Sequence, residues 1–337
     1  NILVERIDLL PYAEVCEWAN TFLLVISDNV FDPLIYYSHG LPVLIALPLA
    51  LFVLMRGPRR TVNVLFFLLV GLFSLWSFFD LILWAHANPD YIMFFWSMLI
   101  LLEPLIYITA FYLVLKILRP EPTPLWIHVI FLGLAAPIAL LLPTTLAIGS
   151  FNLTNCYREV TEGPLVFYGY IYQIFIAASI VLVGLYELFF KRKRSPLLVI
   201  LTVLGLLSFL LFFSLGNIVG SFYEDWTIGQ YGLFGMPFLA GFIAYIMSRF
   251  AIFKTEIHPT ELLVTFSASL IFALLFLENI TLTRIVAAIT FVLFAILGGL
   301  VVRVVKKEHE QKLKIEELAK QLRAVKDLLK ELDRLKI

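Results

Sequence analysis

The sequence has few charged residues and no excess of either charge. Only 15% of the 337 residues are charged, and 25 basic side chains balance 25 acidic ones. Nucleic-acid binding requires a basic face, so this balance leaves no electrostatic footprint for such a partner and we expect none. Residues 1–33 also lack the basic start and apolar run of a signal peptide.

Apolar side chains are what the sequence has in abundance, at 61% of all residues. They come in blocks of about 20 residues, the length at which a helix crosses a bilayer. The blocks are continuous rather than alternating, which argues against the strands of a membrane barrel. The sequence therefore predicts an integral membrane protein of the all-α class, built as a polytopic helical bundle.

Windows of about 19 residues predict nine membrane-spanning helices. Residues 1–35 combine apolar length with acidic side chains, so we interpret them as an amphipathic extracytoplasmic segment rather than a tenth span. The predicted domains are this segment, a bundle over 36–304 and a cytoplasmic coiled coil over 305–337. The nine spans are expected near 36–55, 61–84, 91–118, 125–147, 164–190, 196–220, 229–250, 261–277 and 285–304.

Basic residues gather in alternate connections between the predicted spans. The positive-inside rule places these connections in the cytoplasm, which puts the N-terminus outside and the C-terminus in the cytoplasm. The basic connections are those near residues 56–60, 116–119, 191–194, 249–254 and 303–307.

The two cysteines, Cys16 and Cys156, both lie outside the cytoplasm in this topology. A disulfide can persist there, so we predict that they are joined. Two separate buried thiols are the alternative. Glycines in the later spans, Gly216 and Gly220 in GNIVG and then Gly232 and Gly235, predict places where helices pack closely.

The C-terminal stretch KIEELAKQLRAVKDLLKELDRLKI repeats apolar residues in heptads. This pattern predicts a parallel two-stranded coiled coil that joins two copies in a homodimer, with a simple assembly stalk as the alternative. The last predicted span continues into it without proline or glycine, so a shift of that span could be transmitted to the tail. The predicted seam residues are Ile315, Leu318, Leu322, Val325, Leu329 and Leu332.

Polar residues inside predicted spans are costly and often functional, and we single out three of them. Asp80 and Asn217 belong to the outer half of the bundle, and Glu103, followed by Pro104, lies deeper. We predict an outward-opening ligand or proton site with Glu103 as its central residue. The alternative is that each residue merely bonds a neighbouring helix. The predicted rim residues are Tyr168, Tyr172 and Trp226.

The histidines do not form a pattern that suits a metal or haem. They stand at span ends, in a loop or on the tail, and we expect them to be interfacial. We therefore expect no metal site and no cofactor. The five are His39, His86, His128, His258 and His309.

One block of the sequence resembles a known family. SLGNIVGSFYEDWTIGQYGLFGMPFLAGFIAYIMSRFAIFK, residues 214–254, and the preceding NCYREVTEGPLVFYGYIY are similar to the N-terminal multi-span sensor region of bacterial membrane histidine kinases. The resemblance extends over roughly residues 36–336. It implies a bacterial inner-membrane sensor in a two-component system, whose tail leads into the phospho-acceptor helix of the kinase.

The sequence departs from that family where catalysis would begin. It has no His-Glu/Gln-Leu-Arg-Thr-Pro box and no glycine-rich nucleotide loop, so we expect no catalytic residues and no enzyme activity in this chain. We expect the chain to end just before the output domain of the kinase. A response regulator would then be a partner of that output domain and not of this chain. The predicted function is a receptor for an unknown small-molecule or membrane ligand, embedded in lipid; a transporter or channel with an assembly coiled coil is the alternative.

Overall fold

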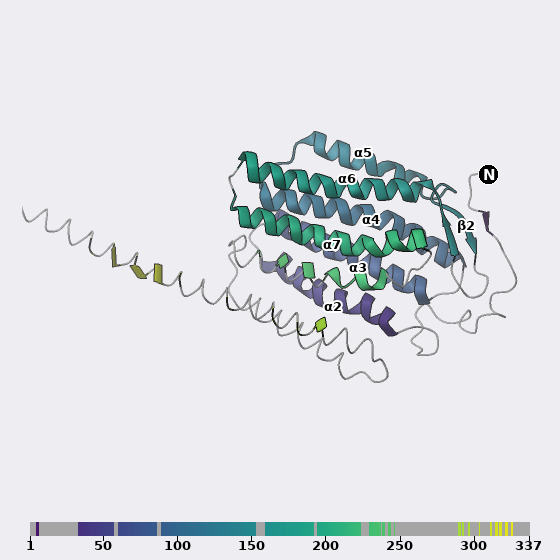
Figure 1. The fold of residues 1–337 in the computed structure, drawn as a ribbon, viewed down its shortest axis with the longest axis horizontal. Coiled ribbons are helices and arrows are strands. Elements are labelled where there is room, and N and C mark those ends of the chain that lie inside the picture. The colour runs from purple at the N-terminus through teal and green to yellow at the C-terminus, as the bar shows by residue number, and fades with distance from the viewer. Residues whose placement is uncertain are drawn as a thin grey trace, which may run out of the picture. The chain divides into compact units, whose positions relative to one another are not determined.

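A computed structural model describes residues 5–6, 33–56, 60–85, 89–152, 159–191, 194–223 and 229–236, with scattered positions from 238 to 325 (Figure 1). Contacts divide the chain into two units, Asn1–Ile246 and Met247–Ile337, and each is described by itself. The described residues are mostly helical, as the sequence predicts.

The first unit is a bundle of helices with a small sheet at one end (Figure 1). Successive long helices run in opposite directions, and α3 packs against both α2 and α4. A short π-helix, η2 (Glu187–Lys191), continues α6. The helices are α2 (Pro33–Arg56), α3 (Arg60–Ala85), α4 (Pro89–Leu118), α5 (Leu125–Leu141), α6 (Pro164–Tyr186), α7 (Pro196–Tyr223) and α8 (Gly229–Gly232).

Four of these helices begin at a proline: α2, α4, α6 and α7. The first turn of a helix has N–H groups without an intrahelical partner, so the missing N–H of proline costs nothing there. Its fixed φ also suits the helix. These prolines explain why the sequence locates the starts of the helices well.

Four helices are long and apolar enough to cross a membrane: Thr61–Trp84, Tyr91–Leu118, Pro164–Lys191 and Pro196–Val219. They coincide with four of the predicted spans and support a membrane protein. The apolar segments Tyr37–Leu51 and Leu125–Leu141 are shorter. The expected span at 261–277, most of the one at 285–304 and part of the one at 229–250 lie outside the described residues, and these three spans stay predictions.

The span expected at 125–147 is too long, because α5 ends at Leu141. Pro143 has no N–H with which to continue the helix. Thr144 instead closes a turn, with its backbone N–H 3.1 Å and its hydroxyl 2.6 Å from the carbonyl oxygen of Leu141. The chain then enters a strand at Ile148.

A three-stranded sheet corrects the expectation of an all-α chain. β2 (Ile148–Asn152) pairs antiparallel with β3 (Glu159–Glu162), and β1 (Glu5–Arg6) pairs parallel with β2. β1 also belongs to the segment that we interpreted as amphipathic. Strands this short show no reliable alternation in the sequence, and the pairing of β1 with β2 joins residues far apart in the chain.

Glycines bring α7 close to α8 and the residues that follow it, as predicted for Gly216, Gly232 and Gly235. A Cβ on Gly216 would lie 2.1 Å from the Cα of Gly229, and one on Gly232 would lie 2.1 Å from the carbonyl oxygen of Phe212. A Cβ on Gly235 would lie 3.0 Å from the Cβ of Phe212. Backbones can approach this closely only because these side chains are absent.

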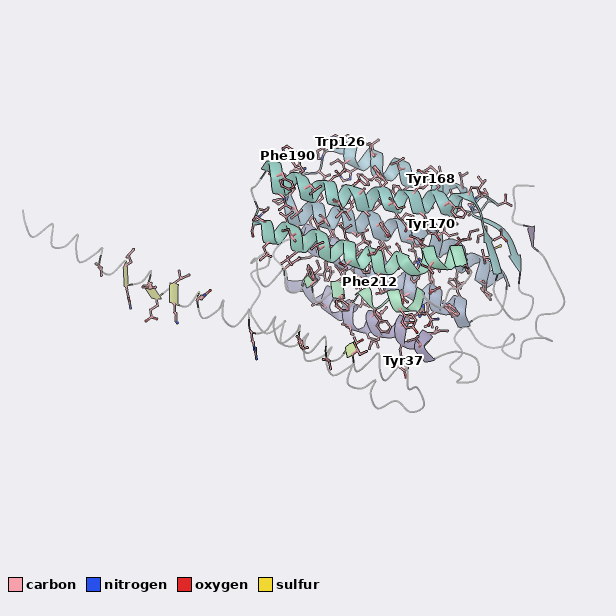
Figure 2. All side chains as sticks on the ribbon, viewed as in Figure 1. Tyr37, Trp126, Tyr168, Tyr170, Phe190 and Phe212 are labelled. Atoms are coloured by element: carbon pink, nitrogen blue, oxygen red, sulfur yellow. The ribbon has the colours of Figure 1, made fainter. Side chains whose placement is uncertain are left out.

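The outer face of the bundle carries large apolar side chains on α5 and α6. Trp126 is 62% exposed and Phe190 is 79% exposed, and both stand at the end of the bundle opposite the sheet (Figure 2). Aromatic side chains at such positions suit the interface between lipid and water. We call the two ends of the bundle the sheet end and the basic end.

The basic end is held by contacts between α4, η2 and the start of α7. The Arg119 side chain donates a hydrogen bond of 2.5 Å to Glu187, which is 2% exposed, and stacks 4.7 Å over the ring of Tyr186. Arg194 donates to the carbonyl oxygen of Leu118 at 3.3 Å. The cations of this end therefore tie helix ends together.

In the second unit, the described seam side chains of the predicted coiled coil are exposed. Ile315 is 66%, Leu318 63%, Leu322 74% and Val325 55% exposed. Their apolar faces are thus not covered within one copy of the chain. Leu329 and Leu332 lie outside the described residues, and the coiled coil stays a prediction.

Candidate functional site

Five polar side chains from three helices form a hydrogen-bonded cluster inside the bundle, which we call the Glu103 network. It lies among apolar helices that can cross a membrane, where a polar side chain without a partner would be costly. Its members are Glu103 and Tyr107 on α4, Gln173 on α6, and Ser214 and Asn217 on α7.

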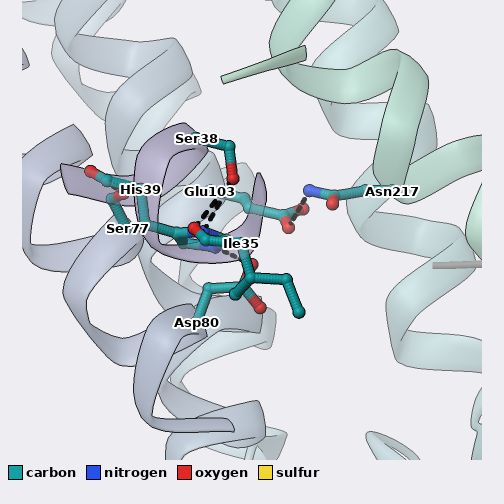
Figure 3. Close-up of polar contacts among 7 residues, drawn as sticks. All are labelled: Ile35, Ser38, His39, Ser77, Asp80, Glu103 and Asn217. Atoms are coloured by element: carbon teal, nitrogen blue, oxygen red, sulfur yellow. Dashed lines mark hydrogen bonds and ion pairs between the residues drawn. The ribbon is translucent and has the colours of Figure 1, made fainter. Parts of the chain in front are cut away.

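The carboxylate of Glu103 is the centre of the network. One oxygen accepts a hydrogen bond of 2.9 Å from Nε2 of Gln173. The other accepts one of 2.5 Å from Nδ2 of Asn217, which Figure 3 shows. The two donors come from different helices. Glu103 thus joins α4 to both α6 and α7.

A second group of contacts fixes the orientation of the Gln173 amide. Its nitrogen faces an acceptor, the Glu103 carboxylate, while its oxygen accepts a 3.3 Å hydrogen bond from Ser214. Ser214 also contacts the hydroxyl of Tyr107, which donates to the carbonyl oxygen of Leu210 at 3.1 Å. The network therefore ends on the backbone of α7.

The sequence places these groups together by helical spacing. Glu103 and Tyr107 are four residues apart on α4, and Ser214 and Asn217 are three apart on α7, so each pair shares one face of its helix. Pro104 follows Glu103 and lacks the N–H that would bond the carbonyl of Ile100. Helix α4 thus has one hydrogen bond fewer next to its carboxylate.

Aromatic rings surround the same level of the bundle. Phe73 on α3 meets Phe209 and Phe213 on α7 edge-on, with ring centroids 5.8 and 5.9 Å apart. Trp76 also packs edge-on against Phe213, at 4.9 Å. All four side chains are buried. This apolar layer strengthens hydrogen bonds within the network and makes any unpaired polar group there more costly.

Asp80 is not hydrogen-bonded to Glu103 and pairs with a histidine instead. Its Oδ2 lies 2.7 Å from Nε2 of His39, which joins α3 to α2 (Figure 3). The charge of Asp80 still acts on Glu103, as does that of Glu162 on β3. The sheet half of the bundle therefore gathers three carboxyl groups and one histidine.

The predicted rim residues face another part of the structure. Tyr168 donates a hydrogen bond of 2.7 Å to the carbonyl oxygen of Leu134, and Tyr172 donates one of 2.6 Å to that of Phe131. Both acceptors belong to α5, close to Pro137, whose ring interrupts the hydrogen bonds of that helix. The two tyrosines therefore attach α5 to α6, and their part in ligand binding stays a prediction.

Other predicted site residues lie outside the described part of the chain: Trp226, Cys16 and Cys156. The ligand role and the disulfide stay predictions. Among the residues that the structure describes, no group of three His, Cys, Asp or Glu side chains could hold a metal ion.

Sequence reasoning singled out Glu103 and Asn217, which the structure brings together, but it missed three of their neighbours, Gln173, Ser214 and Tyr107. It also expected His39 to be interfacial, whereas His39 is buried and binds Asp80. The shared helix faces of Glu103 with Tyr107 and of Ser214 with Asn217 were the available signal. Gln173 had none, because it stands alone in an apolar run.

A carboxylate held by amide donors can change partners without any covalent step. It can take up a proton, accept a cation, or exchange one amide donor for a donor on a ligand. Each change would alter the contacts among α4, α6 and α7. No family model, curated protein or solved structure matches the chain.

Proposed function

We propose that the chain is the membrane sensor module of a two-component histidine kinase and that the Glu103 network is its input site. The observation that carries this proposal is the Glu103 carboxylate, which two amides from two other helices hold inside an apolar bundle. Ionisable groups at such positions are retained for function more often than for stability.

The network suits an input because it couples helices through few, directional contacts. If a signal protonates Glu103 or occupies one of its oxygens, one of the two amide donors, on Gln173 or on Asn217, loses its carboxylate acceptor. Gly216, next to Asn217, leaves no space between α7 and α8, so a displacement of α7 would be passed on to α8. Packed helices of this kind switch between discrete arrangements rather than deform continuously.

The proposed output is the C-terminal helix, paired in a homodimer. The heptads and the exposed side chains of Ile315, Leu318, Leu322 and Val325 support such pairing. In this proposal nine spans cross a bacterial inner membrane, with the basic end and the tail in the cytoplasm. The kinase domain would follow the tail and act on a response regulator.

A chimera tests the input role of Glu103. The chain is fused after residue 337 to a histidine kinase catalytic region, and autophosphorylation is measured in membranes for the parent and for Glu103→Gln. We expect a change of about fivefold or more, the size of a typical coupling energy near 1 kcal/mol. Ser97→Ala is the matched control, because Ser97 is also on α4 but bonds only its own helix, through the carbonyl of Met93.

Equal autophosphorylation in the parent, Glu103→Gln and Ser97→Ala would contradict the input role. A buried polar network would also serve a transporter or channel, which remains the alternative function. Solute flux through liposomes that contain the parent chain, lost in Glu103→Gln, would favour this alternative over the sensor.

A further inference from the structure

His39 has a polar partner on each of its two ring nitrogens. Nε2 lies 2.7 Å from Oδ2 of Asp80, and Nδ1 lies 2.6 Å from the carbonyl oxygen of Ile35 (Figure 3). The histidine side chain is fully buried, while that of Asp80 is 19% exposed. The protonation of this ring is therefore constrained by geometry on both sides.

The contact with Ile35 decides which nitrogen carries a proton. A carbonyl oxygen can only accept a hydrogen bond, so Nδ1 must donate. The hydroxyl of Ser38 donates to the same carbonyl at 2.9 Å, which leaves the Ser38 oxygen, 3.0 Å from Nδ1, to act as an acceptor. Both neighbours of Nδ1 therefore require a proton on it.

The contact with Asp80 then requires a further proton. Either Nε2 is also protonated and the imidazolium donates to a carboxylate, or Asp80 is protonated and donates to a neutral ring. Both arrangements hold one proton more than a neutral His39 beside an ionised Asp80. We propose that His39 and Asp80 form a proton-binding site that joins α2 to α3 and that opens when the proton leaves.

Loss of this proton leaves no arrangement that keeps both contacts. With the remaining proton on Nδ1, the lone pair of Nε2 faces a carboxylate oxygen across 2.7 Å. With it on Nε2, the lone pair of Nδ1 faces the Ile35 carbonyl oxygen across 2.6 Å. One contact must lengthen in either case. The ring must then shift, although the hydroxyl of Ser77 still bonds the backbone oxygen of His39 at 3.0 Å.

Other polar groups come from the helices that pack on α2 and α3. Helix α4, which packs on α3, carries Glu103, and α8, which packs on α2, carries the buried and neutral Gln230. The contact that binds the proton is made by His39, Asp80 and the carbonyl oxygen of Ile35.

Asp80 lies near one end of its helix, so a proton that enters from the sheet end of the bundle travels a short distance to reach it. It lies five residues before the end of α3 at Ala85, or about 8 Å along the helix from the sheet end of the bundle. The proposal concerns the contact between α2 and α3 alone. It does not depend on the sensor function, because a transporter or channel with this pair would bind the proton in the same way.

The test compares the protonation of His39 with the distance between α2 and α3. The full chain, with Cys16 and Cys156 replaced by serine, is placed in lipid nanodiscs. Nitrogen NMR of labelled histidine follows the ring of His39, assigned by its loss in His39→Gln. Leu51 of α2 and Phe78 of α3, which are both exposed, are each replaced by cysteine and spin-labelled. Electron spin resonance then measures the distance between the two labels.

We expect the His39 signal and the label distance to change together, with one midpoint, as the pH is varied. In Asp80→Asn the distance should lose its pH dependence, because a neutral amide cannot hold the proton. His128→Gln is the matched control: His128 bonds Tyr112 at 2.6 Å, away from Asp80, and its replacement should leave the pH dependence of the distance intact.

Two results would overturn the proposal. In the first, the ring of His39 and the carboxyl of Asp80 neither gain nor lose a proton across the range of pH in which the chain stays folded. In the second, His39 titrates while the distance between Leu51 and Phe78 stays constant. Both are measured on the chain with native His39 and Asp80, so a folding defect in a variant cannot obscure them.

Discussion

Asn217 on α7 donates a hydrogen bond of 2.5 Å to Glu103 on α4, although 114 positions separate the two residues. On α4, the bonded carboxylate is followed directly by Pro104, inside the helix. On α7, the donor stands next to Gly216, where α7 packs closely against α8. A change at Glu103 is therefore expected to be felt where α7 meets the later part of the bundle.

Removal of the Glu103 carboxyl group should destabilise the bundle more than its replacement by an amide. Glu103→Ala removes the carboxylate that accepts from Gln173 and Asn217, and for the buried amide of Gln173 this loss costs roughly 1 to 3 kcal/mol. Glu103→Gln keeps an acceptor for Asn217 and should cost less. Thermal unfolding in detergent checks the order, and an alanine variant as stable as the glutamine variant would contradict it.

Replacement of Gly216 by alanine should separate α7 from α8. The added methyl group would meet the Cα of Gly229 at 2.1 Å, so one of the two backbones must shift, which is costly in packed helices. We expect a loss of about 2 kcal/mol or more in unfolding free energy.

Gly71→Ala is the matched control for Gly216→Ala, because a Cβ on Gly71 meets nothing within 4 Å. Alanine favours a helix over glycine, so this variant should be neutral or more stable by up to about 1 kcal/mol. Equal effects of the two variants would show that α7 and α8 do not pack through Gly216.

The ion pair between Arg119 and Glu187 at the basic end should stabilise the fold, because Glu187 is buried. Arg119→Ala leaves Glu187, which is 2% exposed, without its cation, and we expect a loss of roughly 3 kcal/mol in unfolding free energy. Arg119→Ala combined with Glu187→Ala removes the unpaired charge and should recover part of that loss. If the double variant is as unstable as the single one, the pair is not what holds α4 to η2.

The hydroxyls of Tyr168 and Tyr172 should stabilise α5 and leave the output unchanged. Tyr172→Phe deprives the Phe131 carbonyl of its 2.6 Å hydrogen bond, at a cost of about 1 kcal/mol. Hydrogen exchange should rise in α5, while the kinase chimera stays at parental activity. A change in activity as large as that of Glu103→Gln would contradict this expectation and support the ligand role that the sequence predicts for Tyr172.

The sequence predicts the helices that are long and apolar enough to cross a membrane, because a long apolar run is a local feature of the chain. It also identifies Glu103, Asp80 and Asn217, since polar residues inside apolar runs stand out. The partners of these residues are set by how helices rotate and pack, which no single run encodes. For this reason the sequence groups Asp80 with Asn217 and the deeper Glu103 in one predicted site but does not give its hydrogen bond to His39.

The sheet and the length of α5 escaped prediction for a related reason. A strand such as Glu5–Arg6 is too short for a periodic signal, and its pairing with β2 depends on the fold. The run after Leu125 stays apolar beyond the helix, so composition alone extends the span past Pro143. The proline was the local signal for the correct end.

Crosslinking at Val325 tests most directly the claim that the Glu103 network controls a paired tail. Val325 is exposed in one copy of the chain, and Val325→Cys is introduced with Cys16 and Cys156 replaced by serine. In membranes we expect a crosslinked dimer whose rate of formation changes by about fivefold in Glu103→Gln and stays unchanged in Ser97→Ala. Leu322→Asp with Leu329→Asp should abolish it, because like charges would face each other in the seam. No crosslink at Val325, or one rate in the parent and Glu103→Gln, would contradict the sensor account.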